Sequence, residues 1–362
     1  AVLQAYALQE KCKEYINNTY IINYNPNYIR RNYTFIPLKY DINGEKSFKV
    51  NQIKQLLNNI YNINTFFEKR NKFQNFISNN FDLTDPVQEC KDIEKLDFDY
   101  IICGSDQIWN PEIGNGLDKV YFAQLNDKNR IVRISYAASV GKEQINIKYI
   151  PILKKYLDAF DFISVRERSS VKTLKCISNK DIKCVLDPTL MVDSTLWNRF
   201  INPHLTKEKY LLIYRMENNP KIDVLAEQVA RALGLEIIEI GAKNLKYKVR
   251  HKLLSNLGIE EFLSYFYNAE FVITNSFHGT VFSIIFKKCF YALLHSTLGL
   301  RIKDLLEDLS LSNRIVDLHN NVDINNLYSI DWKKTYLLLD GLRGYSVNFL
   351  YTALGFGGNV ND

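Results

Sequence analysis

One histidine stands where a folded chain could use it to carry a proton. His278 follows Asn275 and Ser276, which are typical helix-capping residues, and these follow the β-branched and aromatic run Phe271–Thr274, which is typical of a buried strand. The residues from Gly279 to Phe286 are apolar on most sides, as in a buried helix. We therefore expect His278 in the first helical turn after a strand, where free backbone N–H groups and the helix dipole attract anions. The plainer alternative is a histidine that only packs at the start of a helix.

Other predicted strands also end in polar or small residues. The run 100–103 ends in GSDQIWNP (104–111), where free N–H groups and a short carboxylate come together. The run 131–136 ends in AASVG (137–141), small residues that let a ligand approach the backbone. The run 162–165 ends in RER (166–168), and the run 183–186 ends in DPT (187–189). Parallel strands present their carboxyl ends at one edge of a sheet, so these residues are expected to face a common site.

The residues of the 104–111 loop each have a functional and a structural interpretation. Asp106 could orient an acceptor or act as a base, or it could form an Asx turn. Gln107 and Asn110 could hydrogen-bond sugar hydroxyls. Trp109 could stack on a sugar ring, but filling a gap in the core is the simpler expectation.

The same holds for the strand ends that follow. Arg166 could bind an anion, or it could pair with Asp187 or Glu167 as part of the structure. Arg168 is more easily explained as a surface or domain-bridging charge. Tyr136 and Ser139 are candidates for lining the acceptor side of a site.

The elements that must position these residues alternate between strand and helix, which predicts an α/β fold with parallel sheets. In the first half we expect helices at 1–16, 50–60, 65–81, 147–160 and 169–175, and a further strand at 20–24. The pattern lapses between Met191 and Lys209. The second half then resumes with strands at 210–214, 236–240, 271–274 and 289–294 and helices at 222–233, 259–268 and 301–309.

The predicted architecture is two Rossmann-like domains that face a cleft, with ligands at the carboxyl ends of both sets of strands. The N-terminal domain, the expected acceptor side, covers 1–200, and we expect its first strand upstream of Ala1, because the sequence begins in a helix without Met. The C-terminal domain, the expected donor side, covers 201–325. The segment 326–362 is expected to form a helix from Trp332 that crosses back to the first half.

Composition limits the classes of function. A net charge of +6 and a pI of about 8.7 suit anionic ligands or an acidic membrane surface, but the surplus is too mild for a nucleic-acid-binding protein. The six cysteines form no CxxC pair, so we expect buried thiols and no zinc site or disulfide frame. The sequence shows no signal peptide and no membrane-spanning run, which favours a cytoplasmic protein.

Five strand-end motifs occur together and in order: GSDQIWNP (104–111), SYAASVG (135–141), SVRERS (164–169), VLDPTL (185–190) and NSFHGTVFS (275–283). In this order they resemble the polysaccharide pyruvyl transferase family of bacteria. The resemblance implies a fold similar to GT-B glycosyltransferases. It also implies transfer of the enolpyruvyl group of phosphoenolpyruvate onto a sugar of a polysaccharide or of its lipid-linked precursor, as a pyruvate ketal.

Two members of the family's donor-binding basic cluster carry over by motif position, Arg166 and His278. The better-studied form of the family has Arg-Leu-His where this chain has Ser276-Phe277-His278, so one anion contact must come from elsewhere. Candidates for that contact are Arg215, Lys287, Lys288 and Arg301.

The resulting site prediction has three parts. The catalytic residues are His278 as general acid, Arg166 and Asp106. The donor-binding residues are Arg166, Ser276, His278, Gly279 and Arg215. The acceptor-binding residues are Gly104, Ser105, Asp106, Gln107, Asn110, Tyr136 and Ser139.

The chemistry demands no metal and no cofactor, with phosphoenolpyruvate as co-substrate. The expected partners are phosphoenolpyruvate and a saccharide acceptor, with a lipid-diphosphate-linked form of the acceptor as one option. In that case the protein would contact the inner membrane face peripherally.

Two alternatives remain open at this point. One is a GT-B-like glycosyltransferase that uses a nucleotide-sugar donor in the same place, with Glu239 as a candidate to hold the ribose. The other is an inactive binding subunit, which the serine at position 276 would permit.

Overall fold

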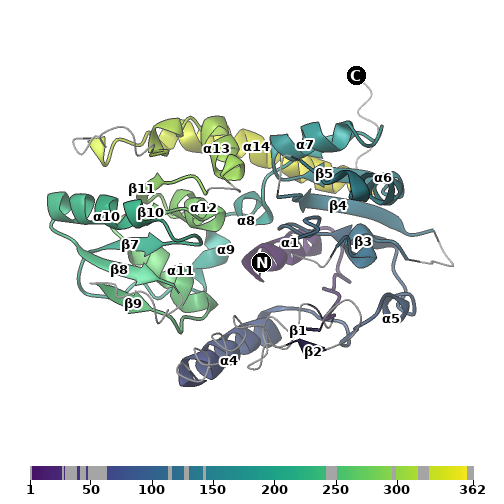
Figure 1. Cartoon of the computed structure of the whole chain (residues 1–362), viewed down its shortest axis with the longest axis horizontal. Helices are drawn as coiled ribbons and strands as arrows, with labels where there is room; N and C mark the ends of the chain where they lie inside the picture. Colours follow the sequence, from purple (N-terminus) through teal and green to yellow (C-terminus); the bar gives the residue numbers. More distant parts are fainter. Residues whose placement is uncertain are drawn as a thin grey trace.

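Two parallel β-sheets organise the chain (Figure 1). The structure is a computed structural model, and it describes residues 2–26, 28, 39–40, 46–47, 63–112, 116–125, 130–141, 144–241, 251–295, 299–316 and 326–356. The first sheet has the order β3-β4-β5-β6 and the second the order β11-β10-β7-β8-β9, with parallel pairing throughout. This is the predicted α/β fold with two Rossmann-like units.

The first sheet consists of β3 (Tyr100–Cys103), β4 (Val132–Ala138), β5 (Phe162–Val165) and β6 (Ile182–Cys184). The described elements around it are α5 (Cys90–Ile93), η2 (Lys119–Phe122), η3 (Ile147–Tyr149), α6 (Ile150–Asp158) and α7 (Arg168–Lys175). The chain then passes through α8 (Pro188–Met191) to α9 (Thr195–Asn198), whose Trp197 packs in the core of the second sheet. Trp109 is 1% exposed and stacks on Phe122 with ring centroids 5.1 Å apart, so the expectation that it fills the core is confirmed.

The second sheet consists of β7 (Tyr210–Tyr214), β8 (Glu236–Ile240), β9 (Lys252–Leu254), β10 (Phe271–Thr274) and β11 (Cys289–Ala292). Its described helices are α10 (Pro220–Leu233), α11 (Ile259–Asn268), α12 (Phe277–Ile285), α13 (Leu300–Asp308) and η4 (Ser312–Arg314). All four residues of β10 are buried because alternate side chains enter two different cores. Val272 packs in the core that contains α11 and α12, whereas Phe271 and Ile273 pack in the core that contains α10.

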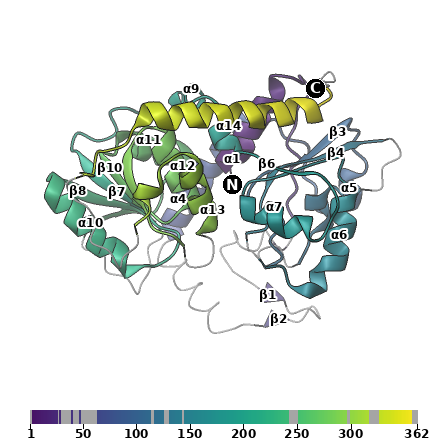
Figure 2. The same cartoon turned by 90° about the horizontal axis from the view of Figure 1, so that it is seen from above.

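Two helices join the halves. α1 (Val2–Lys13) packs Tyr6 into the core of the second sheet and Leu8 into the core beside β4. α14 (Trp332–Ala353) runs across both halves (Figure 2). Its Tyr336 hydroxyl lies 3.1 Å from the Ile284 carbonyl of α12, and its Ser346 Oγ accepts from the Leu186 N–H at 2.9 Å.

A surface ion-pair group also joins the halves. Arg168 at the start of α7 pairs through its guanidinium with Asp304, Glu307 and Asp308 of α13, at 3.4, 2.8 and 3.0 Å. Its side chain is 44% exposed, so these ion pairs contribute little to the free energy of unfolding.

One strand prediction was wrong and one strand was missed. The predicted strand at 20–24 forms only isolated bridges, Ile21 to Leu83 and Tyr24 to Val87. The short strand β9 was not predicted, and the predicted helix at 50–60 lies outside the described residues. The helix expected at 65–81 is α4 (Ile63–Asn80), and β1 (Lys39–Tyr40) pairs antiparallel with β2 (Lys46–Ser47).

The small residues of the SYAASVG motif accommodate a bulge in β4 and do not open the backbone to a ligand. The register of β4 against β5 shifts between Ser135 and Ala138, and Ala137 has a φ of 53°. Ser135 and Ser164 close the gap by hydrogen-bonding each other's backbone, with the Ser135 Oγ 2.9 Å from the Ser164 carbonyl. Residues 135–139 are buried, and neighbouring side chains already cover their backbone.

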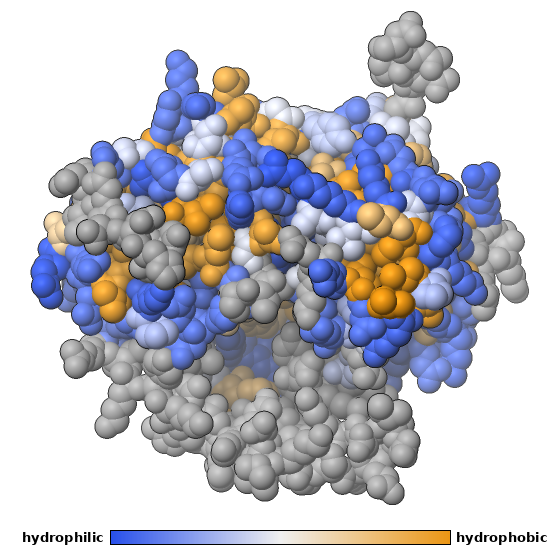
Figure 3. All heavy atoms as spheres, turned by 45° about the horizontal axis from the view of Figure 1, so that its top comes forward, coloured by the Kyte–Doolittle hydropathy of each residue, from blue (hydrophilic) through white to orange (hydrophobic). Residues whose placement is uncertain are grey.

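None of the described helices has the length and apolar character needed to cross a bilayer. The face shown in Figure 3 is mainly hydrophilic, with apolar side chains gathered in separate patches.

Candidate functional site

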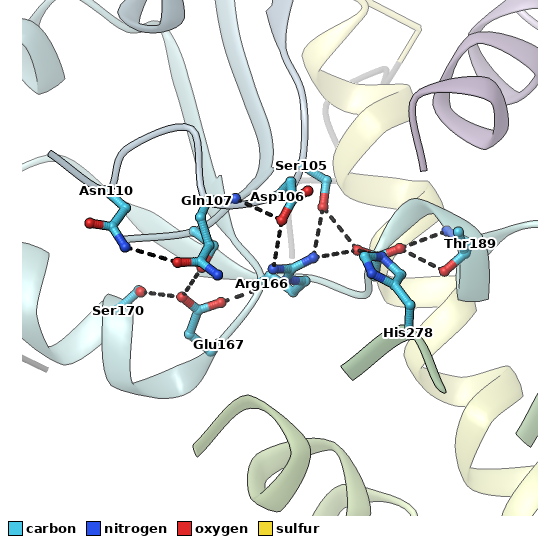
Figure 4. Close-up of polar contacts among 11 residues, drawn as sticks. Ser105, Asp106, Gln107, Asn110, Arg166, Glu167, Ser170, Thr189 and His278 are labelled. Atoms are coloured by element: carbon cyan, nitrogen blue, oxygen red, sulfur yellow. Dashed lines mark hydrogen bonds and ion pairs between the residues drawn. The ribbon is translucent and has the colours of Figure 1, made fainter. Parts of the chain in front are cut away.

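The candidate site lies where strand ends of the first sheet meet the start of α12 from the second (Figure 4). β3 is followed by Ser105 and Asp106, β5 by Arg166, and β6 by Asp187. His278 reaches this group from the first turn of α12. Residues that are far apart in the sequence therefore form one polar cluster, as parallel strand ends are expected to do.

Arg166 lies at the centre of the cluster, and its side chain is only 1% exposed. Its Nη1 donates to Asp187 Oδ2 at 2.7 Å, while Nη2 lies 3.8 Å from Asp106 Oδ1 and Nε lies 3.8 Å from Glu167 Oε2. The two longer separations exceed hydrogen-bond length. Among the described residues, Nε and Nη2 have no hydrogen-bond acceptor. Burial lowers the pKa of Arg166, yet the three carboxylates raise it above its ordinary value, so the guanidinium stays charged.

Asp187 links several members of the cluster through hydrogen bonds to both of its carboxylate oxygens. Its Oδ2 accepts from Arg166 and from the Ser105 hydroxyl at 2.9 Å, and its Oδ1 accepts from the Thr189 N–H at 3.0 Å and the Thr189 hydroxyl at 2.6 Å. Burial raises the pKa of Asp187, but His278, Arg166 and the hydrogen bonds lower it well below its ordinary value. The motif DPT thus supplies an N-cap for α8 and a buried anion at once.

The start of α12 brings His278 and Phe277 against this cluster. Ser276 is the N-cap, and its Oγ accepts from the Gly279 N–H at 3.4 Å. The His278 Nε2 lies 3.6 Å from Asp187 Oδ2, slightly beyond hydrogen-bond length. Phe277 packs its ring under Arg166, whose Cζ is 4.5 Å from the ring centroid.

Gly279 has a packing role that the sequence interpretation did not foresee. A Cβ at this position would collide with Thr274 Oγ1 and would lie 3.0 Å from Tyr214 Cδ1. The helix can therefore start this close to β7 and β10 only with glycine here.

Arg301 is the cation that reaches the site in addition to Arg166. It lies on α13, with its Cζ 5.7 Å from the centroid of the same Phe277 ring. Its Nε is buried and lacks a hydrogen-bond partner in the part of the chain that the structure describes. Burial and the nearby Arg166 charge lower the pKa of Arg301 to about 10, so its positive charge is poorly compensated.

The other three candidates for the missing contact have different partners. Arg215 is held by Asp223 at 2.5 Å and by Glu239 at 2.6 Å. Lys287 and Lys288 follow the far end of α12, over the rings of Tyr336 and Tyr267. The prediction of Arg215 as a donor-binding residue is therefore corrected, because two carboxylates already neutralise it.

Asp106 stands at the edge of the cluster in a left-handed conformation, with a φ of 74°. Its Oδ1 accepts from the N–H of the next residue, Gln107, at 2.9 Å, whereas an Asx turn uses the N–H two residues on, so the predicted Asx turn is not what holds this carboxylate. Burial raises the pKa of Asp106, but nearby positive charges, among them Arg166 and His278, lower it below its ordinary value. An ionised carboxylate thus lies within 4 Å of the Arg166 guanidinium.

The rest of the 104–111 loop is tightly packed. The Asn110 Nδ2 donates to Gln107 Oε1 at 2.8 Å, and a Cβ on Gly141 would collide with that Gln107 oxygen. Gly104 packs against Leu8, where an added Cβ would lie 3.0 Å from the leucine. The amides of Gln107 and Asn110 thus support each other beside Asp106.

Two residues expected on the acceptor side have other roles. Tyr136 is fully buried in the core with Leu8 and Leu350, which corrects its assignment to the acceptor site. Ile134, two residues earlier in β4, lies in the same core, so ordinary strand alternation places Tyr136 there. Ser139 is buried and donates to Glu167 Oε1 at 2.6 Å, so it supports the carboxylate beside Arg166 and cannot reach a ligand directly.

One group of side chains in the second sheet has the composition of a metal site. One ligand atom each from Asp223, Glu239 and His251 lies within 4.8 Å of the other two. However, the Arg215 guanidinium contacts both carboxylates and already supplies a positive charge. His251 Nε2 lies 2.8 Å from Glu239 Oε2, so both oxygens of Glu239 are engaged and the residue is not free to hold a ribose.

The sequence placed Asp187 and Thr189 at a strand end that faces the site, but it gave Asp187 no role beyond pairing with Arg166 and gave Thr189 none. The signal was present, because Asp-Pro-Thr after a strand is a helix-start signature. The sequence does not show that the capping carboxylate of Asp187 faces His278 across the contact between the halves.

Comparisons with known proteins agree with this picture. The family model for polysaccharide pyruvyl transferase matches residues 1–297. Comparison with curated protein sequences gives no significant match.

Among solved structures, a UDP-N-acetylglucosamine 2-epimerase is similar with a TM-score of 0.50, 12% identity, and coverage of 99% of this chain and 95% of that chain. UDP-GlcNAc 2-epimerase from Neisseria meningitidis bound to UDP-GlcNAc aligns at a TM-score of 0.48 and 9% identity, covering 97% and 96% of the two chains. The first of these likenesses supports the GT-B-type fold and nothing further. Because the family model extends over both sheets and includes every strand end of the cluster, the chain belongs to the polysaccharide pyruvyl transferase family.

Proposed function

We propose that this protein transfers the enolpyruvyl group of phosphoenolpyruvate onto two hydroxyls of a sugar, forming a pyruvate ketal on a polysaccharide or its precursor. One observation supports this donor more than any other. Arg166 Nε and Nη2 and Arg301 Nε are buried N–H positions without a hydrogen-bond acceptor among the described residues. Buried donors are normally paired, so their convergence favours an anionic ligand that supplies the acceptors.

The two arginines differ in how far nearby carboxylates already neutralise them. Arg166 is surrounded by three carboxylates, so it offers hydrogen bonds but little free charge. Arg301 has no ion-pair partner among the described residues and a depressed pKa, so a bound anion would stabilise it most. In this proposal Arg301 supplies the anion contact that the family's arginine makes from the position occupied here by Ser276.

The proposed reaction follows from this placement. His278 donates a proton to the methylene carbon of phosphoenolpyruvate, and a sugar hydroxyl attacks the neighbouring carbon. The bond from that carbon to the phosphate oxygen breaks, and a second hydroxyl of the sugar closes the ketal. Of the two hydroxyl protons, one restores His278 and the other leaves with the phosphate. Asp106, kept ionised, is the candidate to accept a hydroxyl proton.

The acceptor side of the proposal uses the loop after β3. Asp106 and Gln107 are partly exposed and offer polar groups to the hydroxyls of a saccharide, while the buried Ser105 and Asn110 support the loop through their bonds to Asp187 and Gln107. The acceptor is proposed as a saccharide unit, free or on a lipid diphosphate. We place the reaction in the cytoplasm, at the inner membrane face if the acceptor is lipid-linked, because phosphoenolpyruvate is a cytoplasmic metabolite.

Calorimetric titration of phosphoenolpyruvate tests the proposal. Arg301→Ala should weaken binding roughly 10- to 100-fold, the effect of losing one charge-assisted contact. His278→Ala should keep binding but lose turnover by about 10²- to 10⁴-fold. Lys288→Ala is the matched control, because it removes a half-buried cation beyond the opposite end of α12 and should change neither. Binding of a nucleoside diphosphate but not of phosphoenolpyruvate by the unchanged protein would overturn the proposal in favour of a glycosyltransferase.

A further inference from the structure

The buried carboxylate of Asp187 accepts more hydrogen bonds than it needs to cap the four-residue helix α8. Oδ1 is occupied by the N–H and hydroxyl of Thr189, and Oδ2 by Arg166 and Ser105. These four hydrogen bonds prevent rotation of the carboxylate. Oδ2 is therefore held facing His278, with the two atoms 3.6 Å apart.

His278 meets charged groups from several elements. Asp187 follows β6, Arg166 follows β5, Asp106 follows β3, and Arg301 of α13 lies on the Phe277 ring next to the imidazole. Asp187 is the partner close enough to count as an ion pair with the imidazole. The ring of Phe277 approaches the imidazole edge-on at 5.4 Å and limits its movement.

We infer that Asp187 is a positioning residue, which orients the imidazole of His278 through Nε2 so that Nδ1 can deliver the proton to the donor. This inference rests on the proposed function for its catalytic meaning. A carboxylate behind a histidine fixes the orientation and the protonated nitrogen of the ring in many sites. Here the two partners come from different halves of the chain, so the acid is aligned only when the halves meet as they do in this structure.

Titration of the His278 imidazole by nuclear magnetic resonance tests the inference without requiring activity. The protein has five histidines, and a His278→Gln variant assigns the signal. In Asp187→Asn the titration midpoint of His278 should fall, because the carboxylate that faces the ring at 3.6 Å loses its negative charge. Asp331→Asn is the matched control, since Asp331 also caps a helix, α14, through a 2.9 Å bond from the Lys334 N–H.

Asp187→Asn leaves Arg166 without its closest partner, which could unfold the protein. A second pair of variants avoids this problem: Arg166→Met alone and Arg166→Met with Asp187→Asn, which removes both charges. The same downward shift between these two supports the inference. An unchanged His278 midpoint in either comparison overturns it.

Turnover separates this inference from the proposed function. If phosphoenolpyruvate is used, the pH at which activity declines on the alkaline side should move down in Asp187→Asn by the same amount as the resonance. If phosphoenolpyruvate is not used by the unchanged protein, the proposed function fails. The resonance shift still decides whether Asp187 controls His278.

Discussion

Gly279→Ala is the substitution whose effect the structure predicts most directly. The added methyl group would collide with Thr274 Oγ1 and lie 3.0 Å from both Thr274 Cβ and Tyr214 Cδ1. Thr274 cannot turn away without cost, because its hydroxyl donates to the Tyr214 carbonyl at 2.6 Å and accepts from the Ser276 N–H at 3.0 Å. Overpacking of this kind costs about 1–3 kcal/mol of unfolding free energy.

The opposite sign is expected for the same substitution in another helix. Gly341 lies within α14, and no atom outside the helix backbone would lie within 4 Å of an added Cβ. Gly341→Ala should therefore stabilise the protein by roughly 0.5–1 kcal/mol through helix propensity alone. Urea unfolding of both variants, followed by circular dichroism, gives the two free-energy changes side by side.

A double-mutant cycle shows whether the collision has the proposed origin. Thr274→Ala removes the hydroxyl that meets the new methyl group, so it should cost less in the Gly279→Ala background than in the unchanged protein. A coupling of about 0.5–3 kcal/mol is expected for residues in contact. Strict additivity, or a Gly279→Ala variant as stable as the unchanged protein, would refute the packing explanation for this glycine.

Three further outcomes follow from other parts of the structure. Arg168→Ala should lower the unfolding free energy by less than about 1 kcal/mol, because its ion pairs are solvent-exposed, and a larger loss in urea unfolding would contradict this. Cys176 is the exposed thiol among the described cysteines, so Cys176→Ser should abolish the fast phase of reaction with a thiol reagent, while Cys12, whose pKa burial raises to about 12, reacts only after unfolding. The folded-state pKa of Asp187 lies below its unfolded value near 3.9, so its stabilisation is present above that pH and is lost as the pH falls. The stability difference between the unchanged protein and Asp187→Asn, measured by urea unfolding from pH 7 to pH 3, should therefore shrink below about pH 4, and a constant difference would show that the carboxylate charge is not responsible.

The strands of both sheets were predictable because short apolar runs bounded by polar loops are local features. The predicted strands at 100–103, 162–165, 210–214, 236–240 and 271–274 coincide with the observed ones. Two short elements were misjudged. The predicted strand at 20–24 does not form, and the short strand β9 was not predicted. Both depend on which neighbouring strand offers a partner, and the local sequence does not specify the partner.

The sequence by itself determined the order of strands and helices, the family, and the strand ends that meet at the site. These follow from periodicity and from motifs that stand at fixed places in the chain. Only the tertiary structure decided which way the side chains point. Tyr136 lies on the face of β4 that packs in the core with Leu8 and Leu350, two carboxylates pair with Arg215, and the turn after β6 places Asp187 opposite His278. The reason is physical: a burial pattern is local, whereas an ion pair between two sheets exists only after both have folded and met.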